Sequence, residues 1–201
     1  MIQPGELLVS AEALEARRCV RNRSAEIAAF DELAQIPAAD SHGTLQCLMD
    51  VVLRLYGVSS AGLSVLRPGS HGHAYFVWEA VSGALAAHQG QGTPGDHSPC
   101  GLCLDTGTAI VLTRPERAFS YLAGVQPAIR EALIAPLYDD DGTPLGTLWV
   151  VHHEPMACFG AHDVLIIERL APVTARAVKR MQTATAHRGS RSASISCPVD
   201  R

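Results

Sequence analysis

The sequence has no apolar run long enough to cross a bilayer and no concentration of positive charge. Its longest apolar stretches, such as residues 132–137 and 145–151, are far shorter than the ~20 residues of a membrane-spanning helix. Residues 1–10 lack the basic start and apolar run of a secretory signal. The 16 Lys and Arg residues are scattered apart from four near the start, and the net charge is −4. We therefore expect a cytoplasmic protein that binds neither membranes nor nucleic acid.

Common catalytic motifs are also missing from the sequence. It contains no Gly-x-Ser-x-Gly elbow, no phosphate-binding loop and no Gly-x-Gly-x-x-Gly after a strand. The acidic run Asp139-Asp140-Asp141 lies at a predicted hairpin tip without further carboxylates at metal-loop spacing, so turn chemistry explains it better than a cation site does. No motif by itself therefore identifies an enzyme.

What is present indicates one domain. The 201 residues are 47% hydrophobic, which is enough for a sizeable core. Six cysteines without a secretory signal are expected to be thiols or metal ligands, because the cytosol keeps thiols reduced. We divide the chain into N-terminal lead-in helices (1–40), a main domain (41–184) and a Ser- and Arg-rich tail expected to be disordered (185–201).

The hydrophobic periodicity changes between helical and strand spacing along the chain. It predicts helices over 10–18, 24–33, 41–56 and 161–183, and strands over 61–66, 74–81, 109–112, 132–138 and 143–153, with a short helical turn at 101–106. Residues 86–99 hold five Gly and Pro breakers and are expected to form a long functional loop. This order predicts an α+β fold in which terminal helices cover one face of a central antiparallel sheet and a loop-covered ligand pocket lies on the other.

Four motifs follow one another in an order typical of a known family. They are Ser98-Pro99-Cys100-Gly101, Leu104-Asp105-Thr106-Gly107, Arg114-Pro115-Glu116-Arg117 and the run from Gly146 to His153. Together they resemble the GAF domains of bacterial sensor histidine kinases, over roughly residues 41–179. The resemblance implies a sheet of about five or six antiparallel strands and a cavity for cyclic nucleotides, tetrapyrroles, haem, iron centres or small metabolites. No kinase, cyclase or DNA-binding module follows, so we expect a stand-alone receptor or an enzyme.

The segment from His97 to Cys103 has the spacing His-x-x-Cys-x-x-Cys, which lets three ligands converge on one metal ion. The same spacing can place a thiolate at a helix N-terminus, where its pKa falls. Cys100 and Cys103 are therefore candidate catalytic residues and metal ligands, with His97 as a further metal or cofactor ligand. The simpler alternative is that Cys100 packs at the base of a helix and Cys103 is a small core residue.

Aromatic and histidine side chains supply the other candidates. His152 and His153 end a predicted strand, so they point to opposite faces of the sheet and only one enters the pocket. Trp149 shares a face with His153, and both are candidate cofactor-binding residues, His153 also as a metal ligand, although a histidine there can simply cap the strand. The resemblance implies that Phe119 and Tyr121 line the cavity, with sealing of the core as the alternative.

These observations leave three functions open. The first is a stand-alone GAF protein that binds a small molecule or cofactor for sensing and forms a homodimer through its terminal helices. The second is an enzyme whose iron or haem is held by Cys and His ligands. The third is a thiol reductase similar to free methionine-(R)-sulfoxide reductase, which we rank lowest because residues 120–130 contain no cysteine. Arg114 and Arg117 can hold an anionic ligand or pair with nearby carboxylates.

Overall fold

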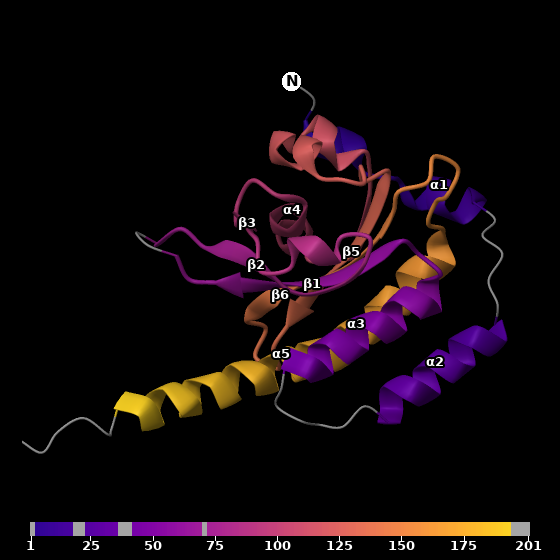
Figure 1. Ribbon diagram of the computed structural model, residues 1–201. Coiled ribbons are helices and arrows are strands. Elements are labelled where there is room, and N and C mark those ends of the chain that lie inside the picture. Colours follow the sequence, from indigo (N-terminus) through magenta and orange to yellow (C-terminus); the bar gives the residue numbers. More distant parts are fainter. Residues whose placement is uncertain (1–2, 18–22, 36–41, 70–71, 194–201) are drawn as a thin grey trace, which may run out of the picture.

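The computed structural model describes residues 3–17, 23–35, 42–69 and 72–193 (Figure 1). Its helices are α1 (Ala11–Ala16), α2 (Arg23–Gln35), α3 (His42–Tyr56), α4 (Pro99–Thr106) and α5 (Ala161–Ala193). Its strands are β1 (Ser60–Arg67), β2 (Tyr75–Gly83), β3 (Gly92–Pro94), β4 (Ile110–Thr113), β5 (Glu131–Tyr138) and β6 (Pro144–His152), and short 3-10 helices include η3 (Ala86–His88), η4 (Pro115–Arg117) and η5 (Ser120–Gly124). These elements confirm the α+β class.

The six strands form one antiparallel sheet in the order β3-β2-β1-β6-β5-β4. Both predicted hairpins, β1–β2 and β5–β6, are confirmed. In the second, Gly142 ends the Asp-rich turn at φ 83°, a left-handed conformation that glycine adopts without steric cost. Because β1 and β6 occupy the centre, the sheet joins the two halves of the chain.

Helices α3 and α5 pack together on one face of the sheet (Figure 1). Alternation along the strands turns Leu63 and Leu148 toward these helices, where Met49 and Ile167 complete the larger of two buried cores. Helix α4 and the segments around η4 and η5 lie over the opposite face and enclose a second core. The predicted arrangement, with the terminal helices on one face and a loop-covered pocket on the other, is confirmed.

Three features of the fold differ from the sequence-based prediction. The predicted 86–99 loop contains β3, a three-residue strand that exists by pairing with β2. The N-terminal segment is attached to the sheet edge, because Leu8 bridges Leu112 and the Val9 amide donates to the Val111 carbonyl. Helix α5 continues to Ala193, so the first part of the tail that was expected to be disordered is helical. The rest of the predicted tail, 194–201, lies outside the described residues.

None of the helices in the described part of the chain is long and apolar enough to span a bilayer.

Candidate functional site

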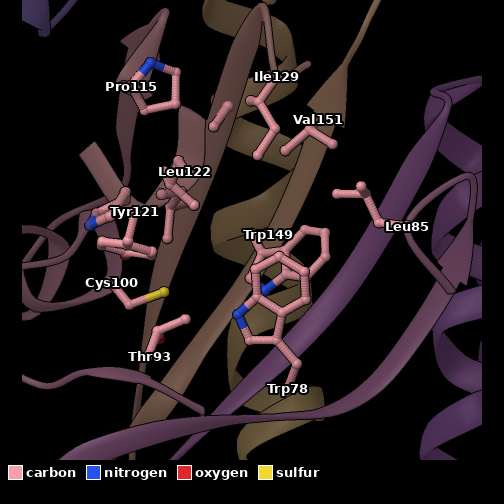
Figure 2. A pocket seen from close by; sticks show the side chains of 13 residues that line it. Trp78, Leu85, Thr93, Cys100, Pro115, Tyr121, Leu122, Ile129, Trp149 and Val151 are labelled. Carbon is pink, nitrogen blue, oxygen red and sulfur yellow. The ribbon is translucent and has the colours of Figure 1, made fainter. Parts of the chain in front are cut away.

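A narrow apolar pocket lies between the loop-covered face of the sheet and α4, η4 and η5 (Figure 2). The space between the atoms amounts to about 430 Å³ including its open mouth, but the centre of a water molecule fits in only about 40 Å³ of it. Its lining residues are Trp78, Leu85, Thr93, Pro99, Cys100, Pro115, Tyr121, Leu122, Ile129, Ala132, Ile134, Trp149 and Val151. A concave, mostly apolar site with a few polar atoms is typical of small-molecule binding.

Two tryptophans form one wall of the pocket. The Trp149 indole occupies the space beside Gly62 on the neighbouring strand, and its Nε1–H donates to Ser64 Oγ at 2.9 Å. Trp78, from β2, packs against it with ring centroids 5.0 Å apart. The hydrogen bond to Ser64 and the close packing on Gly62 fix the indole on the sheet, so this wall is preformed.

The opposite wall is built by α4 and η5. Ser98 caps α4 by accepting a hydrogen bond from the Gly101 amide at 3.0 Å, and Gly107 ends the helix in a left-handed conformation at φ 70°. This short helix presents Cys100 to the pocket. Tyr121 lies beside Cys100, and partial burial raises the pKa of its phenol, which keeps Tyr121 uncharged at neutral pH.

The two candidate cysteines are buried thiols. Burial raises the pKa of Cys100 despite the neighbouring Thr147 and Ser64 hydroxyls, and burial together with Cys100 raises that of Cys103 well above its ordinary value. The Cys103 S–H lies 3.5 Å from two carbonyl oxygens, those of Thr108 and Ile134. Both thiols are therefore protonated at neutral pH, because burial disfavours the charged thiolate. Cys103 faces the core and does not line the pocket.

His97 and Phe119 contact each other outside the pocket. The His97 ring is exposed and packs 5.4 Å from the Phe119 ring. Phe119 is 1% exposed and belongs to the pocket-side core, where it seals the loop rather than lining the space. Of the aromatic candidates, Tyr121 and Trp149 line the pocket.

His153 links two segments at the pocket rim. Its Nδ1 lies 3.0 Å from the Ala128 carbonyl, which only accepts, so Nδ1 carries the proton. In the neutral ring Nε2 then accepts from the Ser60 hydroxyl at 3.0 Å, while Ser60 Oγ accepts the Leu85 amide at 3.1 Å. His152 points to the other face and stacks on Phe159 with centroids 4.4 Å apart, as strand alternation requires.

The predicted metal ligands His97, Cys100, Cys103 and His153 do not come together as a group of three in the described residues. Within the described ranges, no three His, Cys, Asp or Glu side chains lie close enough to hold a metal ion. His153 has both ring nitrogens in hydrogen bonds, Cys103 is enclosed and His97 is turned to solvent beside Phe119. The His-x-x-Cys-x-x-Cys spacing predicted that the three side chains converge. In the structure α4 begins at Pro99, so His97 lies before the N-cap Ser98, whereas Cys100 and Cys103 lie within the helix.

Sequence reasoning missed most of the pocket lining, including Trp78, Thr93, Ile134 and Val151. The alternation of Phe76 and Trp78 in β2 was a usable signal that both share one face, although the bulge between Leu63 and Ser64 shifts the register against β1. Thr93 carried no such signal, because its strand is formed by pairing rather than by local pattern.

Comparison with known proteins agrees with this geometry. The GAF domain family model matches residues 38–179. The GAF domain of Acinetobacter phosphoenolpyruvate-protein phosphotransferase superposes with a TM-score of 0.63 at 12% identity, covering 83% of this chain and 99% of that one. Free methionine-R-sulfoxide reductase from Neisseria meningitidis, in complex with its substrate, gives 0.59 at 17% identity, covering 85% and 99%.

A phycoerythrobilin-bound GAF domain from a cyanobacterial phytochrome gives a TM-score of 0.60 at 12% identity, covering 83% of this chain and 98% of that one. At such identities these structures share the fold, and they do not transfer a ligand or an activity. No curated protein matches the sequence significantly. The family match over more than half of the residues, together with the six-stranded sheet and its pocket, establishes that this chain belongs to the GAF domain family.

Proposed function

We propose that this GAF domain is a sensory module that binds a small organic molecule in the pocket between Trp149 and Tyr121. The observation that carries the proposal is the preformed aromatic wall, in which Trp149 is held by Ser64 and packed against Trp78. Apolar sites of this kind gain affinity from burial and need few polar contacts. The narrowness of the space favours a ligand of one or two rings over a tetrapyrrole.

The two enzymatic alternatives have less support. An iron or haem enzyme needs a donor set that His97, Cys100, Cys103 and His153 do not form in this conformation. A thiol reductase needs a thiolate at the substrate, whereas burial raises the pKa of Cys100, and the lining residues from η5 and β5 include no other cysteine. Binding without covalent chemistry is therefore the function favoured here.

The experiment uses the protein's own fluorescence. The chain has two tryptophans, and both Trp78 and Trp149 line the pocket, so any change in emission reports on this site. A library of small organic compounds is titrated while tryptophan emission and Tm are recorded. A binder is expected to change the emission and to raise Tm, because a ligand of the folded state stabilises it.

A matched pair of variants assigns the binding to the pocket. Ala132→Leu adds bulk to a lining residue, and Ala87→Leu makes the same change at an exposed position. Loss of binding in the first variant and retention in the second supports the proposal. Equal binding by both variants would place the ligand elsewhere. An ultraviolet-visible spectrum and metal content of the untagged protein test the alternative centre, and a Soret band or stoichiometric iron would revive it.

We also retain the homodimer as a proposal. Helix α5 exposes Leu165 (54%) and Val173 (40%), and α2 exposes Ile27 (59%), so apolar side chains remain uncovered on the helical face. Light scattering coupled to size exclusion measures the mass of the particle in solution. A mass of two chains that falls to one in a Leu165→Glu/Val173→Glu variant supports it, and a wild-type mass of one chain rejects it.

A further inference from the structure

We propose that the pocket selects an uncharged aromatic ligand that carries one hydrogen-bonding group, recognised by the hydroxyl of Thr93. This inference rests on the proposed function and specifies the chemistry of its ligand. Three observations carry it, namely the charge of the lining, the shape of the walls and a buried hydroxyl without a partner.

The lining carries no ionised group. None of the thirteen side chains is Asp, Glu, Lys, Arg or His, and the pKa shifts of Cys100 and Tyr121 keep both neutral at pH 7. An ionised phosphate or carboxylate in such a site loses its hydration without gaining a counter-charge. Of the two alternatives for Arg114 and Arg117, the structure favours pairing with carboxylates over anion binding in this pocket, because neither lines it and Arg114 pairs with Glu116 at 3.3 Å.

The shape of the space suits a flat ring. Trp78 and Trp149 lie on one side, and Tyr121 and Cys100 on the other (Figure 2). Aromatic side chains attract ring systems in offset-stacked or edge-to-face arrangements. A planar molecule slides between these walls with smaller displacements than a branched aliphatic one of equal volume.

Thr93 supplies the polar recognition. It lines the pocket, is 9% exposed, and its Oγ1 has no hydrogen-bond partner among the described residues. A buried hydroxyl without a partner is costly, so it favours any ligand that brings one. The Trp149 Nε1–H already donates to Ser64 and cannot take this role. Thr93 and Cys100 both line the pocket, and Figure 2 shows them toward the same end of it, so this is where the ligand's polar atom belongs.

The test compares phenol, toluene and benzoate, three single-ring probes that differ in one substituent. Each is titrated into the full chain at pH 7 while tryptophan emission is followed, with Thr93→Val and Thr93→Ser as variants. We expect the wild type to bind phenol about three- to tenfold more tightly than toluene, the effect of one hydrogen bond, and benzoate more weakly than both. Thr93→Val, which keeps the shape but removes the hydroxyl, should abolish the phenol preference, and Thr93→Ser should retain it.

The outcomes distinguish an error in the ligand class from an error in the proposed function. If phenol and toluene bind but their ratio is the same in the wild type and Thr93→Val, or if benzoate binds as tightly as phenol, the ligand class is wrong while the pocket still functions. If none of the three probes binds the wild type while a compound of the library does, the ligand class is wrong and the proposed function stands. If no compound of the library binds either, the proposed function fails as well. A preference for phenol that disappears only in Thr93→Val supports the assignment of Thr93.

Discussion

Trp149 lies so close over Gly62 that a Cβ at residue 62 would fall 2.1 Å from Cζ2 of the indole. The two residues are direct partners across β1 and β6. Because Gly62 has no side chain, it leaves the space that the Trp149 indole occupies. In this position the indole also donates a hydrogen bond to Ser64 Oγ and packs against the ring of Trp78. The aromatic wall of the pocket therefore depends on a glycine that contacts no ligand.

We expect Gly62→Ala to displace Trp149. The free energy of ligand binding should then fall at least as much as the free energy of unfolding. Overpacking of this kind costs about 1–3 kcal/mol of unfolding free energy, and the displaced indole loses its hydrogen bond to Ser64. Urea denaturation and the tryptophan emission maximum measure the two effects. Gly124→Ala is the control, because a Cβ there meets nothing within 4 Å. Unchanged emission in Gly62→Ala would contradict this account.

Elements defined by local pattern were predictable from the sequence. Helix α3 carries apolar residues at helical spacing and is followed by Gly57 in a left-handed conformation, and the β5–β6 hairpin carries an Asp-Gly turn. In both cases the signal lies within a few residues of the element it specifies. The arrangement of helices on one face followed from their order, because an antiparallel sheet needs only one covered face.

The candidate site was only partly predictable, because its members meet through tertiary contacts. Cys100, Tyr121 and Trp149 do line the pocket, whereas His97 and Cys103 are separated from it by the local geometry of α4. A linear spacing such as His-x-x-Cys-x-x-Cys does not say where a helix begins. Thr93 was invisible because β3 exists only through its partner β2.

The N-terminal segment is held to the domain by a buried carboxylate. Glu131 is 4% exposed, and its oxygens lie 3.1 Å and 3.3 Å from Arg17 and accept from the Phe159 amide at 2.6 Å. We expect Glu131→Ala to lower the free energy of unfolding by about 2–4 kcal/mol, since it leaves a buried amide without an acceptor. Chemical denaturation beside Glu168→Ala, an exposed control, measures the difference. A loss below that of the control would show that the network does not stabilise the fold.

The buried thiols predict an alkaline limit to stability. The pKa of Cys103 in the folded protein lies well above 9.0, its value when exposed, so the unfolded chain loses this proton first as pH rises. Stability from this group is complete below about pH 9 and decreases above it. Denaturation at a series of pH values should show a decline that is smaller in Cys103→Ala. Equal declines in the two proteins would attribute it to other groups.

Cysteine labelling tests the same burial by a direct route. Cys47 is exposed on α3, whereas Cys100 and Cys103 are buried with raised pKa values. Alkylation at pH 7.5, followed by peptide mass spectrometry, should therefore modify Cys47 well before the other two, since the thiolate is the reactive form. Rapid labelling of Cys100 in the native protein would instead indicate an activated thiol and restore the reductase hypothesis.

His153 should act as a positioning residue, since its ring joins the Ala128 carbonyl to the Ser60 hydroxyl, and Ser60 in turn holds the Leu85 amide. Ala128 precedes the lining residue Ile129, and Leu85 itself lines the pocket, so the ring ties two parts of the rim together. We expect His153→Ala to cost about 1–3 kcal/mol of stability through two lost hydrogen bonds and to weaken phenol binding without changing the preference for phenol over toluene. Exposed His73 provides the matched control, His73→Ala, in denaturation and fluorescence titrations. If His153→Ala matches this control in both stability and phenol binding, His153 has no positioning role. If the substitution instead removes bound iron, His153 is a metal ligand.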